Sequence, residues 1–414
     1  MAKRANLALT ALSLSLAINS FIAIADTKIK ASFDFSYINT SNNPQWLNSW
    51  QDEGTGVLRY DATTDAFNFR QGFVELDSEL TDSIDASITA FAHKDGDQHV
   101  GITEAFITYK PLASGWLKRY RVGMFYPKFS TENVAGGWQS PYTYSYSAIN
   151  SWLGEELRVN GIEAEFIRLG RRAKTDYDLS VVGAIFIGND PIGTLLSWRG
   201  WAIHDRQSLF NDRVEMANYP TIDTGAFVQP SWVNPIKEVD GRPGYYLGVH
   251  YKQKRKHDIR LYIYDNLADP GQTGDDNQYS WRSKFASLAW KYRISPSTQL
   301  LTQAVYGASF MGDNEMVDID FFSAYAMLTH KTPYGRFSGR IERFLVKEKD
   351  SFAIDANDSD GNALTLAWRF PVFDNDEIGI EYLTVDSYNE NRQLWGWRQQ
   401  NRQSQVQAVY KLNF

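Results

Sequence analysis

The sequence contains no cysteine among its 414 residues, which excludes disulfides, thiolate metal sites and cysteine nucleophiles. After residue 25 no stretch approaches the ~20 apolar residues that a membrane-spanning helix needs. No basic patch of the kind that nucleic-acid binding requires is present, and the net charge is −7. None of its six histidines lies in an HExxH motif, and none of its serines lies in a GxSxG motif. The sequence therefore predicts no nucleic-acid partner, no cofactor, no metal and no catalytic residues.

The N-terminus has the pattern of a secretory signal peptide. Lys3 and Arg4 precede the apolar segment 7–24, and a small–x–small sequence ends at Ala25. This pattern predicts an exported protein, with residues 1–25 removed after Ala25. Removal changes the net charge from −7 to −9, because only Lys3 and Arg4 leave. The alternative is a membrane-anchoring helix, which the serine and threonine content disfavours.

What the chain does contain is alternation of apolar and polar residues, the period of a β-strand. The last residues, VQAVYKLNF, place Val406, Ala408, Tyr410, Leu412 and Phe414 on one face. An unprotected terminal strand of this kind is an aggregation hazard unless it pairs with another strand. Sixteen such segments are predicted, at 27–39, 68–79, 84–93, 101–110, 117–125, 158–167, 176–188, 244–252, 256–265, 282–293, 297–308, 317–329, 335–346, 361–370, 376–386 and 404–414.

The connections between these segments alternate in length. Short, turn-forming sequences such as KQKR and KTPYG follow every second strand, whereas most of the other connections are long. This alternation is typical of outer-membrane barrels. The fold class predicted for residues 26–414 is therefore all-β: one transmembrane antiparallel barrel, surrounded by outer-membrane lipid, with the last strand closing on the first. A periplasmic β-sandwich is the alternative.

The ending of the chain and two neighbouring strands resemble known bacterial proteins. The terminal Phe414 resembles the signal that the barrel assembly machinery reads in outer-membrane barrels. TEAFITYKP at 103–111 and RVGMFYPKFSTEN at 121–133 resemble the phosphate-selective porin O and P family, in the matching residues Glu104, Ala105, Phe106, Tyr109, Val122, Gly123, Phe125, Phe129 and Glu132. The resemblance implies a sixteen-stranded channel, usually a homotrimer, whose third loop, here 126–157, folds inward as a constriction.

Phosphate selectivity does not follow from the resemblance, because members selective for phosphate carry lysines on the third loop. Here Lys128 is the only cation of loop 126–157, against three glutamates. Alternation along the strands supplies further cations that point inward, and rings of charge near the narrowest point set selectivity. The pore-lining candidates are Arg119, Arg121, Lys128, Arg260, Arg336 and Arg340. They predict weak anion selectivity; the alternative is that they are hydrated wall residues.

Three tyrosines stand at every second position of the same loop, at 142, 144 and 146. If they project together, Tyr142, Tyr144 and Tyr146 offer ring faces and hydroxyls to a sugar or another ring-bearing solute. The alternative is that the rings pack the loop against the barrel wall. The second long connection, 189–243, exceeds the length of ordinary structureless loops. We expect it to cap the mouth or to reach over a neighbouring subunit.

The predicted function is passive diffusion of small hydrophilic or anionic solutes across the outer membrane of a bacterium, without covalent chemistry. A channel specific for carbohydrates or aromatic solutes is the first alternative. An outer-membrane hydrolase using His204, Asp205 and Ser208 is another, disfavoured because triad members usually come from separate segments. A structural barrel with a filled lumen is the third. The acidic runs Asp269–Asp276 and Asp355–Asp360 are left without an assigned metal.

Overall fold

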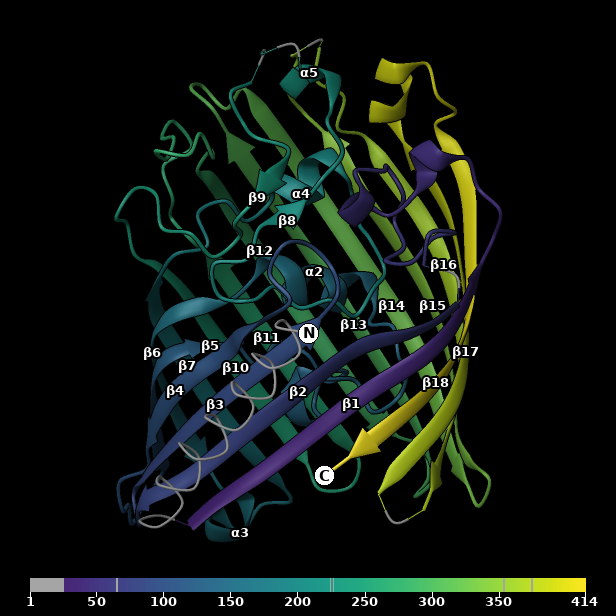
Figure 1. The fold of residues 1–414 in the computed structure, drawn as a ribbon. Coiled ribbons are helices and arrows are strands. Elements are labelled where there is room, and N and C mark those ends of the chain that lie inside the picture. The colour runs from purple at the N-terminus through teal and green to yellow at the C-terminus, as the bar shows by residue number, and fades with distance from the viewer. Residues whose placement is uncertain (1–25, 65, 224, 226, 353, 374) are drawn as a thin grey trace, which may run out of the picture.

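The computed structural model describes residues 26–414 except residues 65, 224, 226, 353 and 374. The predicted signal peptide lies outside the described residues. Sixteen antiparallel strands form a closed barrel (Figure 1). They are β1 (Asp26–Thr40), β2 (Ala66–Thr81), β3 (Ile84–His93), β4 (Val100–Tyr109), β5 (Leu117–Phe125), β6 (Val159–Arg168), β7 (Tyr177–Ile187), β10 (Gly244–Gln253), β11 (His257–Asp265), β12 (Trp281–Arg293), β13 (Thr298–Met311), β14 (Val317–Thr332), β15 (Gly335–Glu348), β16 (Ser359–Val372), β17 (Asp376–Asn389) and β18 (Gln400–Asn413).

The predicted closure between the first and last strands is confirmed. β1 pairs with β18 through partners such as Phe33 with Leu412 and Phe35 with Tyr410. Beyond the last strand the amide of Phe414 still donates to the carbonyl of Ala31, at 2.9 Å. Closure gives every strand of the barrel two neighbours, so no open edge remains to pair with another chain.

Strand boundaries agree with the predicted segments near the turns and differ mostly at the loop ends. β13 continues to Met311 and β18 begins at Gln400, three and four residues beyond the predicted limits of 308 and 404. The first residues of β18, QNRQ, are polar on both faces, so alternation there ends before the hydrogen-bonded ladder does. The register of β13 with β14 is continuous from Thr298 to Met311, without a bulge.

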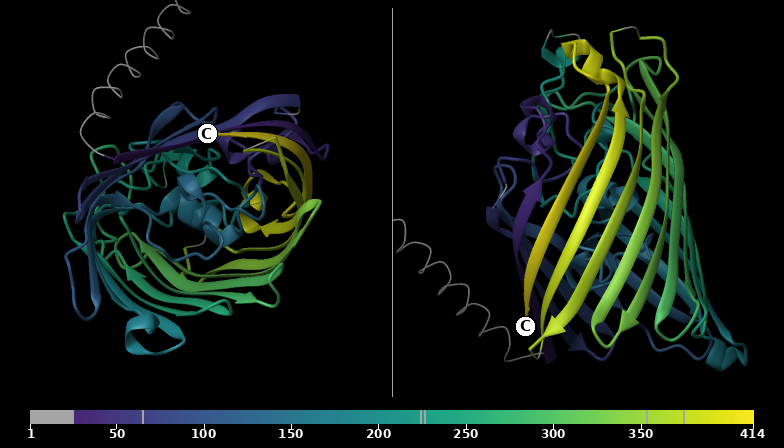
Figure 2. Two further views of the ribbon diagram at one scale, coloured as in Figure 1. Left: turned by 90° about the horizontal axis from the view of Figure 1, so that it is seen from below. Right: turned by 90° about the vertical axis from the view of Figure 1, so that its right-hand side faces the viewer.

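Short turns gather at one end of the barrel and long loops at the other, as predicted (Figure 2). The turn end holds the short connections, one of which contains α3 (Gly170–Ala173). The C-terminus also lies at this end (Figure 2), as does Asp26, which pairs with Glu79 beside the β2–β3 turn. The loop end carries the remaining helices, namely α2 (Ala148–Glu156), α4 (Thr194–Trp198), α5 (Pro220–Asp223) and 3-10 turns at Gln45–Leu47, Trp50–Asp52, Gly136–Trp138 and Glu390–Trp395, together with a two-stranded sheet of β8 (Val214–Glu215) and β9 (Trp232–Val233).

The outside of the barrel is apolar. Large hydrophobic side chains that alternate with inward polar residues are exposed on it, for example Ile185, Leu247, Ile263, Leu288, Ile341 and Val406. Aromatic rings pair on the outside near the turns, including Tyr109 with Tyr120 and Tyr177 with Tyr251. An apolar band bounded by aromatic residues is the surface that lipid requires of a barrel. Among the described residues, no helix is long and apolar enough to cross a bilayer.

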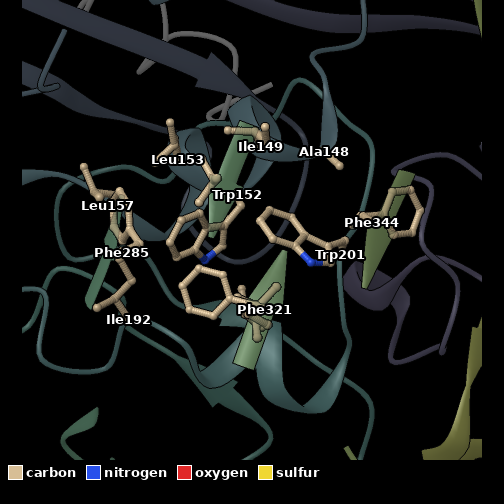
Figure 3. Packing of buried hydrophobic residues seen from close by; sticks show 14 of the residues in the cluster. Ala148, Ile149, Trp152, Leu153, Leu157, Ile192, Trp201, Phe285, Phe321 and Phe344 are labelled. Atoms are coloured by element: carbon tan, nitrogen blue, oxygen red, sulfur yellow. The ribbon is translucent and has the colours of Figure 1, made fainter. Parts of the chain in front are cut away.

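The hydrophobic core of this protein lies inside the barrel. Among the connections that turn inward are the β5–β6 loop (residues 126–158), which carries α2, and the β7–β10 loop (residues 188–243), which carries α4 (Figure 2). Trp152 of α2 packs against Phe285 and Phe321 of the wall, with ring centroids 5.2 and 5.3 Å away (Figure 3). Trp201 of the β7–β10 loop completes the cluster. The loop-side half of the lumen is therefore packed like a protein interior.

Candidate functional site: the barrel lumen

The β5–β6 loop crosses the lumen and is anchored on the opposite wall. The carboxylate of Glu381 on β17 accepts hydrogen bonds from the amides of Tyr144 and Ser145, at 2.6 and 2.9 Å. On β15, Glu342 accepts from the amide of Ala148 at 2.7 Å, at the start of α2. These amides would otherwise be unpaired in a dry interior, because a loop and the first turn of a helix leave backbone donors without partners.

Arg340 on β15 is the main anchor, and it is fully buried. Its guanidinium forms ion pairs with Glu132 of the loop at 2.9 Å and with Glu342 at 2.7 Å. It also donates to the carbonyls of Ser145 and Tyr146. The sequence placed Arg340 among the selectivity residues of the pore. The structure gives it a different place, because its donors are directed at the loop and the wall and none of its surface faces an aqueous path.

Two residues of the family-like motif acquire a physical role in this geometry. Gly123 has φ +132, and a Cβ atom there would lie 2.3 Å from the carbonyl oxygen of Ala105. Only glycine allows this approach between β4 and β5. Glu132 is fully buried within the loop. Its carboxylate accepts a hydrogen bond from the side-chain amide of Asn150 at 2.6 Å and forms an ion pair with Arg340. The motif therefore shapes the β5–β6 loop and its connection to the wall.

The three tyrosines do not project together. Tyr142, Tyr144 and Tyr146 are 5%, 3% and 1% exposed. The Tyr144 hydroxyl donates to Glu377 of β17 at 3.0 Å, whereas the Tyr146 ring packs against Trp138 within the loop. The segment is irregular rather than extended, so alternate residues do not share a face. In this conformation the rings pack the loop against the wall, and little of their surface is available for a solute.

The β7–β10 loop lies inside its own barrel rather than over a neighbouring subunit. Arg199 pairs with Glu155 of α2 at 2.8 Å, and the indole of Trp50, from the loop at 41–65, donates to the same carboxylate at 3.0 Å. Trp201 donates to the carbonyl of Leu345 on β15. Three separate loops therefore meet around Glu155 at the loop-side end of the barrel, and of the two placements expected for residues 189–243 these contacts fit a cap over the mouth better than a reach over a neighbouring subunit.

Burial and charge act on the two glutamates at the end of α2 in different ways. Burial alone would raise the pKa of Glu155, but Arg199 and His204 beside it hold that pKa well below its usual range. Glu156 has no ion pair among the described residues, and burial raises its pKa to about 7, although the Leu195 amide and Arg199 oppose the rise. Glu155 therefore stays charged, whereas Glu156 titrates near neutral pH.

The hydrolase alternative required His204 and Ser208 to lie together. His204 Nε2 lies 3.3 Å from Glu155, and its Nδ1 accepts from the amide of Arg206 at 3.1 Å. The Ser208 hydroxyl instead lies 3.4 Å from the guanidinium of Arg158. Asp205 pairs with Arg59 at 2.8 Å. These partners orient the three side chains in different directions, so they do not have the arrangement of a catalytic triad.

Three of the remaining predicted cations lie on or near the wall formed by β5 and β6, each beside a carboxylate. Arg119 and Lys128 share Glu165, at 3.0 and 3.4 Å. Arg121 pairs with Glu163 at 3.0 Å and is buried, since only 6% of its surface is exposed. A girdle of unpaired arginines is thus absent from this wall among the described residues. The sequence identified the inward cations but not the carboxylates that they face.

The last two candidates contact the β5–β6 loop. Arg260 donates to the carbonyl of Ser130 and lies 3.2 Å from Asp258 on its own strand. The guanidinium carbon of Arg336 lies 5.2 Å from the ring centroid of Tyr142, a cation–π distance. Neither side chain extends freely into a channel. Both hold the turn-side surface of the loop.

Open space lies on the turn side of the β5–β6 loop. One cavity of about 180 Å3 has a lining of Lys252, Gln253, Arg255, Lys256, His257, Asp258, Lys291, Arg293 and Gln299. A second cavity, of about 200 Å3, shares Lys252 and Asp258 and extends to Arg260 and Glu165. Together we call them the turn-side cavity. Of these lining residues only Arg260 was among the predicted pore-lining candidates, although the inward parity of β10 places Lys252 on the same wall.

The closed sixteen-stranded barrel, its apolar outside and its inward loops define the fold of porin-type outer-membrane proteins. It is similar to the outer membrane channel DcaP of Acinetobacter baumannii, with a TM-score of 0.55, 12% identity and coverage of 95% of this chain and 98% of that one. A loop-deletion mutant of OmpT, an outer membrane protein of Vibrio cholerae, matches with a TM-score of 0.53 and 7% identity, over 94% of this chain and 100% of that one. Salmonella typhi OmpF in complex with daunomycin matches with a TM-score of 0.51 and 9% identity, over 94% of this chain and 98% of that one.

At such low identities these likenesses establish the fold. No protein-family model matches the sequence, and no curated protein matches it. The resemblance to the phosphate-selective porin O and P family is therefore supported at the level of the sixteen-stranded barrel, and the particular family stays a prediction.

Proposed function

We propose that this protein is an outer-membrane channel through which small hydrophilic solutes diffuse, with anions favoured. The observation that carries the proposal is the turn-side cavity: a space lined by charged and polar residues within a closed barrel whose outside is apolar. A barrel that only needed to be stable would have no reason to keep this half of its lumen open. DcaP, with a similar fold, is described as a channel.

The preference for anions rests on the charges that line the first part of this cavity. Five lysines and arginines line its first part, against the single carboxylate of Asp258 among the described lining residues. Charged groups that line a narrow path select by sign. The second part is balanced, with Glu165, Asp178 and Asp258 beside Lys252 and Arg260. The proposed selectivity is therefore weak, and it resides on the turn side rather than in the predicted arginines 119, 121, 336 and 340.

Export, assembly and oligomeric state belong to the same proposal. A leader cleaved after Ala25 would deliver the chain across the inner membrane. The exposed Phe414 ring at the end of the barrel would be accessible to the barrel assembly machinery. One form of Vibrio cholerae OmpT, a protein of similar fold, is described as a trimer, and we propose a homotrimer here.

A second candidate, a structural barrel without transport, is favoured by the dense packing of the loop side. Dozens of buried apolar residues form one cluster there, which includes Trp50, Trp152, Trp198 and Trp201. In this state the two inward loops leave little room for a solute. The two candidates differ in one respect: a channel needs loops that move or leave a narrow path, whereas a structural barrel does not.

Recordings from the purified protein in a planar bilayer test both candidates. We expect stepwise conductance, with a zero-current potential across a salt gradient that indicates weak anion preference. Replacing Lys252→Gln together with Lys291→Gln should move this potential toward cations. The control, Lys347→Gln, removes a cation that pairs with Asp358 at the loop end, and it should change nothing. Absence of conductance would favour the structural barrel, and strong cation selectivity that the double substitution leaves unchanged would refute the anion preference.

The wall arginines need a charge-balanced test. Replacing Arg121 alone would leave Glu163 buried without its partner, so a change in selectivity could come from unfolding. The matched variant is Arg121→Gln with Glu163→Gln, which removes both charges and keeps similar shapes. We expect this pair to leave the zero-current potential unchanged, because the pair is electrically neutral at the lumen.

A further inference from the structure

Three carboxylates converge where the two ends of the β7–β10 loop meet. Asp190 follows β7, whereas Glu238 and Asp240 precede β10. One ligand oxygen from each lies within 4.8 Å of those of the other two. Calcium binds oxygen at about 2.4 Å, so oxygens on opposite sides of one ion are separated by about twice that distance. The spacing of the three carboxylates matches the coordination shell of such an ion.

A second observation is the state of Asp190 itself. This side chain is fully buried, with 0% of its surface exposed. Its Oδ2 accepts from the amides of Val239 and Asp240, at 2.5 and 3.3 Å. Its Oδ1 is also buried and has no hydrogen-bond partner within the described structure. A buried carboxylate oxygen without a donor is costly unless a cation or a proton compensates its charge.

The neighbouring cations do not supply that compensation. Lys237 pairs with Asp276 at 2.5 Å, and Arg242 pairs with Asp269 at 2.7 Å. In the described part of the chain, none of the three converging carboxylates forms an ion pair with a lysine or arginine. In the described structure the buried Oδ1 of Asp190 therefore has neither a hydrogen-bond donor nor a basic side chain to compensate its charge.

We propose that Asp190, Glu238 and Asp240 bind a divalent cation of the calcium type, which joins the two ends of the β7–β10 loop. Hard cations prefer carboxylate oxygens, and the number of charged ligands tunes the affinity. The ion would hold the base of the loop against the wall, where the carbonyl of Asp190 already accepts from the amide of Trp281 at 2.7 Å. Sequence analysis assigned no metal here, because Asp190 and Asp240 are far apart in the chain.

Terbium luminescence tests this site directly, because Tb3+ replaces Ca2+ and Trp281, whose backbone amide donates to the carbonyl of Asp190, supplies an aromatic residue near the cluster in the chain fold. The folded protein is first freed of metal with a chelator. We expect sensitised Tb3+ emission that Ca2+ displaces. Asp190→Asn and Glu238→Gln should each weaken the affinity roughly tenfold or more. The control, Asp275→Asn, removes an exposed carboxylate outside the cluster and should bind as the natural protein does.

The alternative occupant is a proton on Asp190, which Asp190→Asn would mimic. In that case the natural protein shows no Ca2+-displaceable emission, and the proposal is wrong. Equal affinity in the natural protein, Asp190→Asn and Glu238→Gln would also overturn it. Retention of the β-sheet circular dichroism signal verifies folding; if Asp190→Asn fails to fold, the half-buried Glu238 gives the same comparison. Because the readout is binding, it is independent of whether the barrel conducts.

Discussion

The loop-side half and the turn-side half of the lumen are built from the same kinds of side chain in opposite ways. In the loop-side half, Arg340 is fully enclosed between Glu132 and Glu342. In the turn-side half, Lys252 and Lys291 line a cavity of about 180 Å3. The first arrangement stabilises one conformation of the loops, and the second leaves charge available to a solute.

The difference teaches that an inward charge in a barrel is not by itself a selectivity residue. Desolvated ion pairs cost much when one partner is lost, whereas solvated charges contribute little to stability and act through their field. Substitutions should therefore separate the halves: those on the loop side should change stability and gating, and those on the turn side should change selectivity.

The largest effect is expected from Arg340→Ala. It leaves Glu132 and Glu342 buried without their cation, and loss of one such partner typically costs about 3–5 kcal/mol. We expect the β5–β6 loop to leave the wall, with greater protease cleavage within 126–158 and higher conductance. Arg343→Ala, on the same strand but in an exposed pair with Asp360, is the matched control and should cost less than about 1 kcal/mol. If Arg340→Ala and Arg343→Ala changed stability and loop cleavage equally, the distinction between the two halves of the lumen would be wrong.

The next effect concerns the apolar contacts of the loop-side half. Trp152→Ala removes the ring that packs on Phe285 and Phe321, and truncation of a buried tryptophan costs about 3–5 kcal/mol. The free energy of unfolding in denaturant should fall by this amount, with the barrel still able to form. Trp116→Ala, at an exposed turn-end position, should leave the free energy nearly unchanged.

A smaller effect is expected from pH, through Glu156. Its pKa is 4.5 as an ordinary carboxyl and about 7 in the folded protein. The contribution of this group to the free energy of unfolding is therefore fully present below pH 4.5 and is lost as pH rises through 7. The total change in that free energy is roughly 3 kcal/mol. The docked loop should be more easily cleaved by protease, and more often open in bilayer recordings, at about pH 8 than at about pH 5.

Glu156→Gln isolates this contribution, because it keeps the shape and removes the titration. Burial lowers the pKa of His204, although Glu155 opposes this, and that group favours folding as pH rises, in the opposite sense. His204 is unchanged in the variant, so the difference between the two proteins reports Glu156 alone. An identical pH profile in both would show that Glu156 does not control the loop.

The smallest effect is the salt dependence of the turn-side half. The Debye length falls from ~10 Å at 0.1 M to ~3 Å at 1 M salt. The difference in zero-current potential between the natural protein and the Lys252→Gln, Lys291→Gln variant should therefore shrink as salt increases. A difference that persists at about 1 M would mean that these lysines bind the solute directly.

Most of the fold could be predicted because strand alternation is a local signal. The residues of VQAVYKLNF show which face meets lipid, and the short turns fix which strands are neighbours. Closure between β1 and β18 then follows from an even strand number. The loop-end limits of β13 and β18 were missed because hydrogen bonding continues beyond the membrane, where lipid no longer imposes alternation.

The site could be predicted only in part, because its partners come from distant segments. Parity along a strand shows that Arg121 and Arg340 point inward, but not that Glu163 and Glu132 neutralise them. The tyrosine run suggested a solute platform because a period of two was assumed, whereas the segment is irregular. The packing of residues 188–243 inside the barrel has no local signature, because Trp198 and Trp201 find their partners on other segments.

The anchors of the β5–β6 loop also set an order of events during biosynthesis. The amide of Tyr144 and the carboxylate of Glu381 are 237 residues apart, and Gln139 meets Lys411 across 272 residues. Contacts of such separation form late and slowly. The loop is made early but reaches its final place only when the last strands arrive. The contacts with Glu381 and Lys411 therefore complete the interior when the seam closes, and a chain that stops short of β17 keeps the anchors on β15 but lacks these last ones.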